Sequence, residues 1–335
     1  MTVAAAPLPA QRKRPRIGRD TRTALTYLAP AFIVMGLITF YPLVFQTYMS
    51  FTDFGLRNLR PGAEAPPFVG LDNYIKILSS QLSIPNFEFF RLIFFNLWWA
   101  LSNVVIHVTI GVLVAVTLNL PGVRFKRIWR AIYILPVVIP PIIVATVWRN
   151  MFDTEYGAIN QILAVLGGAF ALPAEMFRID WLRQAQDPIP FIPLPLAYFA
   201  LLAANTWLGW PLNSVVATGA LQSIPSELYE AAEMDGASIF QRFKTVTLTY
   251  LRPAMLPYAI YGFVITFNLF YLSYFMTAGQ PFGRTELLVT QAFRLVNEQR
   301  LYGVGAAFAI IMFFILLAIT IVTNKMAKAT ARYDA

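Results

Sequence analysis

The chain has 335 residues, of which 58% are hydrophobic and 13% are charged, and its mean hydropathy is +0.59. A soluble domain carries about 25% charged residues because its surface faces water, so the composition excludes soluble domains and predicts a membrane protein. The chain has no cysteine and one histidine, which excludes disulfides, thiolate chemistry and a histidine-rich metal site. The meaning of the formal net charge of +9 depends on where the charges lie.

Six stretches are long and apolar enough to cross a bilayer, which takes about 20 largely apolar residues. None contains Asp, Glu, Lys or Arg, and the single ionisable side chain among them is His107. The first stretch follows a basic tail and lacks a small-residue cleavage site, so it is predicted to be an uncleaved anchor. The predicted spans are Thr26–Ser50, Leu92–Asn119, Ala131–Trp148, Leu194–Leu221, Pro253–Thr277 and Leu301–Thr323.

These spans predict an all-α polytopic membrane protein, with a transmembrane domain over residues 26–323 between tails at 1–25 and 324–335. When the N-terminus is placed inside, the cytoplasmic segments collect most of the 26 basic residues and a minority of the 17 acidic ones. This asymmetry predicts that both termini are cytoplasmic. The excess of basic residues is therefore interpreted as a topology signal rather than as a nucleic-acid interface. The first 20 or so residues, rich in Ala, Pro and Arg, are expected to be disordered.

The connections between the spans carry further local signals. The outer loops at about 51–90 and 149–193 are rich in Pro and aromatic residues, and Asn73–Leu78 and Ile159–Leu166 are candidates for short interfacial helices. Pro136, Pro140 and Pro141 are expected to break the third span, because proline supplies no backbone N–H to a helix. The break is compatible with gating or with shape alone.

The segment 223–253, predicted to be cytoplasmic, is expected to form short helices rather than an unstructured linker. Pro225 and Ser226 predict a helix start with Ser226 as a possible cap, and the acidic residues that follow suit the helix dipole. The Asp235-Gly236 pair predicts a turn that ends this helix, and Ser238 has capping-box spacing for a second one. The resulting apolar surface predicts a docking partner, although padding of the membrane surface is the alternative. It comprises Leu228, Tyr229, Ala231, Ala232, Met234, Phe240 and Phe243.

This segment resembles the EAA loop of importer-type ABC transporter permeases. In that family the loop is the coupling helix that sits in a cleft of the ATP-hydrolysing subunit. The resemblance assigns the ATPase-coupling role to Glu230, Ala231, Ala232, Asp235, Gly236 and Ala237. Here Glu230 is expected to make a polar contact in the cleft and Gly236 to form a turn that a Cβ would disturb. One departure is Thr249, which stands where the family usually has proline.

The flanking residues are similar to the MalF family of maltose and maltodextrin permeases. The similarity is carried by the run from Asn205 to Pro211, by Phe267–Phe270 and by the tail from Lys328 to Asp334. It implies a sugar cargo, with Asn205, Leu208 and Gly209 at matching contact positions. Thr266 stands at a contact position whose residue is changed, and Trp207 and Trp210 are further candidates from their own chemistry. Most other maltose-contact positions are changed, so maltose itself is less well supported than a sugar. A related polyol-like cargo such as trehalose or glycerol phosphate is the alternative.

The residues themselves agree with a neutral, hydroxyl-rich cargo. An asparagine amide can both donate to and accept from a hydroxyl, and an indole can stack on the C–H face of a sugar ring. Asn205 can equally bond a neighbouring helix, and the tryptophans can be packing or interfacial residues. His107 has no evident partner in the sequence and is interpreted as structural.

Other functional classes fit the sequence less well. A transporter coupled to protons or sodium usually has a charged residue within a span, and these spans have none. A channel needs a polar or charged filter, which the spans also lack. An enzyme lacks the groups to build a site. No P-loop sequence is present, so ATP and Mg²⁺ are expected on a partner ATPase and no cofactor on this chain. The resemblance implies as partners a second permease (MalG-like), an ATPase dimer, an extracytoplasmic sugar-binding protein, the oligosaccharide and the lipid bilayer, in a cell membrane.

Overall fold

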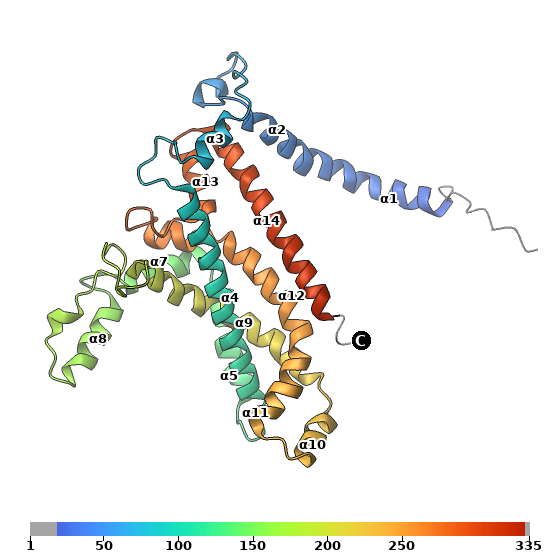
Figure 1. Ribbon diagram of the computed structural model, residues 1–335, viewed down its shortest axis with the longest axis vertical. Coiled ribbons are helices and arrows are strands. Elements are labelled where there is room, and N and C mark those ends of the chain that lie inside the picture. Colours follow the sequence, from blue (N-terminus) through green and yellow to red (C-terminus); the bar gives the residue numbers. More distant parts are fainter. Residues whose placement is uncertain (1–18, 332–335) are drawn as a thin grey trace, which may run out of the picture.

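The computed structural model describes residues 19–331, with side chains for residues 21–325. The predicted disorder of the first 20 or so residues falls largely outside this range. Within it the chain is helical, and its one β-pairing is an isolated bridge between Thr52 and Phe68. Figure 1 shows a bundle of long helices from which the N-terminal arm, formed by α1 and α2, projects to one side. The all-α class predicted from the sequence is confirmed.

The helices follow one another with short irregular connections except in the two loops that the sequence predicts to be outer ones. Some are interrupted by π-helical segments, labelled η like the short 3₁₀ helices. The elements are α1 (Arg19–Met35), η1 (Gly36–Phe40), α2 (Tyr41–Ser50), η2 (Leu56–Leu59), α3 (Asp72–Leu78), α4 (Phe89–Asn119), α5 (Lys126–Tyr133), α6 (Leu135–Val138), α7 (Pro141–Met151), α8 (Ala158–Gly168), η3 (Ala174–Phe177), α9 (Leu196–Gln222), α10 (Ser226–Met234), α11 (Ile239–Arg242), η4 (Phe243–Thr247), α12 (Leu248–Phe267), η5 (Leu272–Thr277), α13 (Leu288–Asn297) and α14 (Tyr302–Ala331).

The described residues contain four or five candidate spans, against the six predicted. Four described helical stretches are long and apolar enough to cross a membrane: Thr21–Ser50, Phe89–Asn119, Ile239–Thr277 and Tyr302–Lys325. A bent pair of helices adds a fifth if it is counted as one span. The predicted fourth span is the 27-residue helix α9, which is long enough to cross a membrane but less apolar than the candidate spans. Its polar residues are buried against other helices, so it does not need a lipid-facing composition.

The predicted third span is the bent pair, formed by residues 126–138 and 141–151, and the two parts meet at 95°. The break lies at Ile139 and Pro140, whose ψ angles of 130° and 129° are outside the helical range. Pro140 and Pro141 have no N–H with which to continue the helix. The break predicted from the prolines is confirmed. Its effect is to set α7 at a steep angle to α5 and α6.

Two predicted interfacial helices and the ends of the transmembrane domain can also be placed. The predicted helices at Asn73–Leu78 and Ile159–Leu166 correspond to α3 and α8. Helix α1 begins at Arg19, so part of the expected N-terminal tail is helical, and α14 continues through the expected C-terminal tail to Ala331.

The core that positions the central helices lies among α4, α9 and η5. Trp99 of α4, Tyr198 and Leu201 of α9 and Leu272 of η5 are all nearly inaccessible to solvent and pack in one cluster. The ring of Tyr198 meets that of Trp99 edge to face at 6.2 Å, and its hydroxyl donates to Ser102 at 2.8 Å. Burial of these large side chains fixes the N-terminal half of α9 beside α4.

Candidate functional site: a polar seam, an aromatic cavity and a cytoplasmic docking end

Helices α4 and α9 meet along a polar seam of three layers. In the first layer Asn205 Nδ2 donates to Asn103 Oδ1 at 2.8 Å. In the second, the ring of His107 lies against Gly209 and within hydrogen-bonding reach of the Asn205 backbone carbonyl. In the third, Asn213 lies against Gly111 and donates to the Gly209 carbonyl at 3.0 Å.

The seam shows that the two helices run in the same direction. Each layer advances four residues along both chains, from 103 to 111 on α4 and from 205 to 213 on α9. Each helix also provides one glycine at the position where the other presents its bulkiest polar side chain. A small residue opposite a larger one is how helices approach closely in a membrane, where polar groups also bond across the interface.

The seam also contains polar atoms that are left without a partner. Among the described residues, His107 Nε2, Ser214 Oγ and Thr218 Oγ1 are buried and make no hydrogen bond. Leaving such an atom unpaired costs about 1–3 kcal/mol when it is shielded from water. The seam is therefore close-packed but not fully satisfied.

The predicted substrate residues do not gather on one side of α9. Asn205 and Gly209 face α4 within the seam, whereas Trp207 meets Trp148 edge to face at 6.2 Å and Trp210 meets Tyr133 at 5.2 Å. The 3.6-residue period of the helix separates positions 205, 207 and 210 around its axis, so the asparagine and the two indoles meet different neighbours.

The remaining two predicted residues lie apart from the indoles as well. Leu208 packs against the core cluster that contains Trp99, and Thr266 is buried near the end of α12. In this state Asn205 is bound to a neighbouring helix, which is one of the two alternatives that its sequence context left open.

Trp207 lines an apolar cavity of about 290 Å³ together with α7. Trp148 forms the other aromatic wall, and the remaining lining is aliphatic: Ile139, Ile143, Val144, Val147 and Met151. The cavity exists because α7 turns away at the proline break and leaves a space beside α9. The sequence analysis missed Trp148, since a tryptophan at the end of a predicted span has the pattern of an interfacial anchor.

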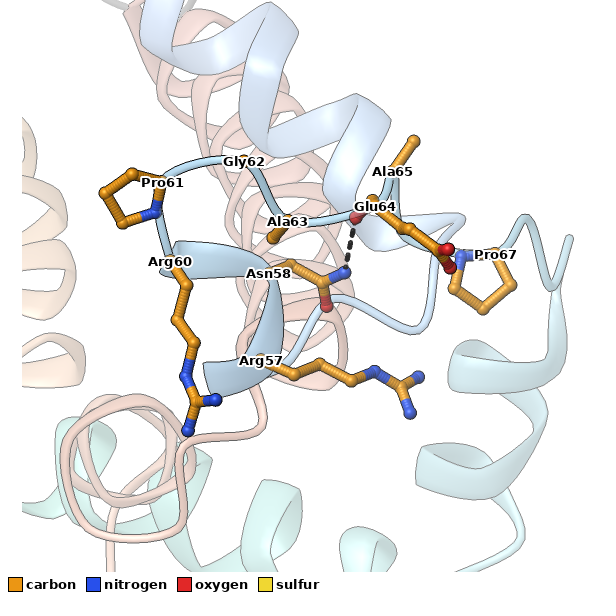
Figure 2. Close-up of a pocket in the computed structure, with 9 residues that line it drawn as sticks. All are labelled: Arg57, Asn58, Arg60, Pro61, Gly62, Ala63, Glu64, Ala65 and Pro67. Atoms are coloured by element: carbon orange, nitrogen blue, oxygen red, sulfur yellow. Dashed lines mark hydrogen bonds between the residues drawn. The ribbon is translucent and has the colours of Figure 1, made fainter.

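A larger hollow of about 630 Å³ is lined entirely by residues 57–67 of the loop between α2 and α3. Figure 2 shows the loop folding back over the short helix η2, with Asn58 Nδ2 donating to the Glu64 carbonyl at 3.1 Å. Arg57 and Arg60 line it and are exposed. Because the hollow lies within one loop and is not bounded by the long helices, it is a surface feature rather than part of a path through the bundle.

The end of the bundle that the sequence predicts to be cytoplasmic consists of α10, a turn and α11. Gly236 adopts φ +74°, the left-handed region that favours glycine, and no atom lies within 4 Å of where its Cβ would be. The turn and the capping box between Ser238 and Gln241 are confirmed. Ser226 is not a cap, however: Pro225 occupies the N-cap position and Ser226 is the first helical residue.

This end is tied to the bundle but exposes its outer surface. Arg242 pairs with Glu233 at 2.7 Å, and Tyr229 bonds Thr247 at 2.9 Å, which holds α10 to α11 and η4. Met234, Ile239 and Phe240 are 89%, 79% and 74% exposed. Of the predicted coupling residues, Glu230, Ala231, Asp235 and Gly236 are exposed, and Ala232 and Ala237 are partly buried.

A scan against protein families matches residues 107–332 to the binding-protein-dependent transport system inner membrane component. The chain belongs to this family. The match covers most of the helical bundle, including the second and third layers of the seam, the aromatic cavity and the α10–α11 end. The importer-type permease identified from the resemblance of residues 223–253 is confirmed, and so is its location in a membrane.

Curated relatives and solved structures agree with the family. The chain is 29% identical to the galactooligosaccharides transport system permease protein GanP of Bacillus subtilis, over 90% of this chain and 69% of that protein. It is 33% identical to the trehalose/maltose transport system permease protein MalF of Thermococcus litoralis, over 78% and 80%. A bacterial ABC transporter for the import of alginate has the same fold, with a TM-score of 0.70 at 20% identity over 93% of this chain and 97% of that one.

Proposed function

We propose that this chain is one permease subunit of an ABC importer that carries a neutral oligosaccharide of the maltodextrin type into the cytoplasm. The observation that carries the proposal is that similar permeases are named for galactooligosaccharides, for trehalose and maltose, and for maltodextrin. The common chemistry of these cargoes is a neutral chain of sugar rings. A glycerol-phosphate cargo is disfavoured, because the predicted spans contain no Lys or Arg to compensate a phosphate in the path.

The cytoplasmic end supports a separate ATPase as the source of energy. Met234, Ile239 and Phe240 form an exposed apolar surface that is costly in water unless a partner covers it. In the proposal this surface and Glu230 dock in a cleft of the ATPase, which binds ATP and Mg²⁺. Closure of an ATPase dimer then displaces α10, and the links from Arg242 to Glu233 and from Tyr229 to Thr247 transmit the displacement to α12.

The N-terminal arm supports a second permease subunit. The apolar residues of α1 and α2 are mostly exposed, and a groove of about 1050 Å³ runs between α2 and α14 with an almost entirely aliphatic and aromatic lining. In the proposal a second permease packs against this arm. The parallel course of α4 and α9 agrees with one bent span between them, which lets both helices enter the membrane from the same side. In the proposed topology that side is the outer one.

For the cargo, we propose that Trp207 and Trp148 form the contact surface in the present state. Two indole faces at the edge of the 290 Å³ cavity suit the C–H faces of a sugar ring. Asn205 and Gly209 are enclosed in the seam, so a sugar hydroxyl reaches the Asn205 amide only when α4 and α9 separate. In the proposal the remaining three predicted residues do not contact the sugar in this state. They are Trp210, Leu208 and Thr266.

Co-purification with the candidate ATPase, followed by ATP hydrolysis in nanodiscs with the sugar-loaded binding protein, tests the proposal. Maltose, maltotriose, trehalose and glycerol phosphate form the panel, and stimulation by a neutral sugar is expected. Phe240→Asp is expected to lose the ATPase, whereas Phe191→Asp, which changes an even more exposed phenylalanine in an outer loop, is expected to retain it. Gly236→Pro is expected to break coupling. If both Phe240→Asp and Gly236→Pro retained the ATPase and transported sugar normally, the coupling assignment would be wrong.

A further inference from the structure

Helix α5, with the sequence KRIWRAIY, separates basic from apolar side chains on its surface. Successive residues advance by about 100° around a helix, so Lys126, Arg127 and Arg130 share one face. The apolar residues Ile128, Trp129 and Ile132 occupy the opposite face. The helix follows a tight corner at Pro121–Phe125, where Gly122 and Phe125 both have positive φ angles. This corner sets α5 at the end of α4, toward the same end of the bundle as α10 and α11 (Figure 1).

Both faces of α5 are without a protein partner over much of their area. Ile128, Trp129 and Ile132 are each more than half exposed, and Phe125 is 70% exposed. Exposed aromatic and branched side chains in this density are unusual on a surface that faces water. They are expected where the apolar face of a short helix enters the boundary between headgroups and acyl chains.

The basic residues beside this face carry no compensating charge. Among the described residues, Arg124, Lys126, Arg127 and Arg130 form no ion pair. Lys126 donates to the Leu120 carbonyl at 2.7 Å. Arg130 Nε is shielded from solvent and has no acceptor. No Asp or Glu occurs between Asn119 and Arg149. No described acidic side chain therefore compensates the charge of these four basic residues.

We propose that Arg124, Arg127 and Arg130 form a binding site for the phosphate headgroup of an anionic phospholipid, with Trp129 and Phe125 in the acyl region beneath it. A phosphate diester supplies the acceptor that Arg130 Nε lacks and the negative charge that the three guanidinium groups require. Arginine binds phosphate oxygens through several N–H groups in a fixed fork, which favours this ligand over a diffuse counterion. Under the proposed topology the lipid belongs to the cytoplasmic leaflet.

The observations favour a lipid over an acidic protein segment. A protein that neutralised the arginines would still leave the apolar face of α5 to be covered, and that face points away from the basic one. A phospholipid satisfies both faces at once, because its phosphate and its acyl chains are at different depths. The inference depends on the membrane location of this chain and not on the identity of the cargo, so failure of the sugar assignment would leave it intact.

Trp129 supplies a direct readout of the lipid at this site. The full transporter is reconstituted in phosphatidylcholine nanodiscs that contain either spin-labelled phosphatidylglycerol or spin-labelled phosphatidylcholine at the same mole fraction. The quenching that is lost in Trp129→Phe reports the lipid beside α5 and is separated in this way from the other tryptophans. We expect phosphatidylglycerol to quench this component more strongly than phosphatidylcholine, and the difference to shrink as salt is raised.

Charge variants test the arginines themselves. Attraction of about 1 kcal/mol per basic residue near an anionic surface corresponds to about a fivefold change in affinity for each charge removed. Arg127→Gln is expected to weaken the preference for phosphatidylglycerol about fivefold, and the triple variant R124Q/R127Q/R130Q to abolish it. The triple lysine variant keeps the charge and is expected to retain part of the preference. Lys325→Gln removes one exposed basic residue near the end of α14 and is expected to have no effect.

Two results would overturn the proposal. The first is equal quenching of Trp129 by the two lipids, or no quenching by either, which would indicate that a protein subunit covers α5. The second is a preference for phosphatidylglycerol that survives the triple glutamine variant while that variant remains folded. If the triple variant does not fold, Arg127→Gln decides the matter, because Arg127 is exposed and forms no described ion pair or hydrogen bond.

Discussion

Replacement of Gly209 by alanine tests whether the polar seam is close-packed as the structure indicates. An added Cβ would lie 2.5 Å from Nε2 of His107 and closer still to Cε1 and Nδ1. The ring has little room to move, because His107 is 6% exposed and its imidazole lies within reach of the Asn205 carbonyl. Overpacking of this kind costs about 1–3 kcal/mol.

A matched control on the same helix separates packing from helix propensity. At Gly219 no atom lies within 4 Å of an added Cβ. Alanine is favoured over glycine in a helix interior by up to about 1 kcal/mol. We therefore expect Gly219→Ala to leave stability unchanged or raised, and Gly209→Ala to lower it. The two substitutions make the same chemical change, so their difference measures the contact with His107.

A double-mutant cycle assigns the cost to the imidazole. His107→Ala removes the ring, and the Cβ of Gly209→Ala then enters the space that the ring has left. The double variant is expected to recover about 1–3 kcal/mol relative to the sum of the single effects, which is well above the few tenths expected for independent sites. SDS-induced unfolding of the permease in mixed micelles provides the free energies. Additive single effects, or equal behaviour of Gly209→Ala and Gly219→Ala, would refute the packing described here.

Three further outcomes follow from the structure. Gly111→Ala places a Cβ 2.5 Å from Asn213 Cβ and 2.9 Å from its backbone carbon, so unfolding in SDS should show a loss at least as large as that of Gly209→Ala. Asn96→Leu removes the side chain that donates to the Phe267 carbonyl at 3.1 Å and accepts from Leu288 N at 2.8 Å, and should expose both segments to hydrogen exchange. Burial raises the pKa of Glu286, so the free energy of unfolding should fall as the pH rises from the pKa of this carboxyl in the unfolded chain through its raised pKa in the folded protein. In Glu286→Gln the melting temperature should therefore depend less steeply on pH over that range, as thermal unfolding would show.

The features predicted correctly from the sequence are those whose cause is local. The turn at Gly236 depends on the conformational freedom of one residue, and the box between Ser238 and Gln241 depends on a spacing of three. The break in the third span depends on adjacent prolines. Each of these signals lies within one helical turn, so no knowledge of the tertiary structure is needed to interpret it.

The features that were missed depend on partners distant in the sequence. Asn103 and Asn205 are separated by 102 positions, and neither residue indicates in sequence that the other satisfies its amide. The same holds for Gly209, whose role is set by His107 on another helix. Helix α9 was expected to be a span with Asn205 inside it, and its buried polar residues are tolerated because α4 and the core cover them. Trp148 was overlooked because its neighbour Trp207 comes to it only through the bend at Pro140.

The positions of straight helices and of helices with prolines or π-helical turns indicate which helix would bend when α10 is displaced. Helix α9 leads almost directly into α10, and the seam fixes it to α4 through three consecutive layers, so these helices resist independent movement. Helix α12 differs, because it contains Pro253 and Pro257, is preceded by the π-helical segment η4 and ends before a non-helical stretch at Asn268 and Leu269. Prolines and π-helical turns are the usual places at which a helix bends. A displacement of α10 that reaches α12 through Tyr229 and Thr247 is therefore expected to bend α12 before the seam opens, and α12 is the helix whose far end Asn96 holds against α13.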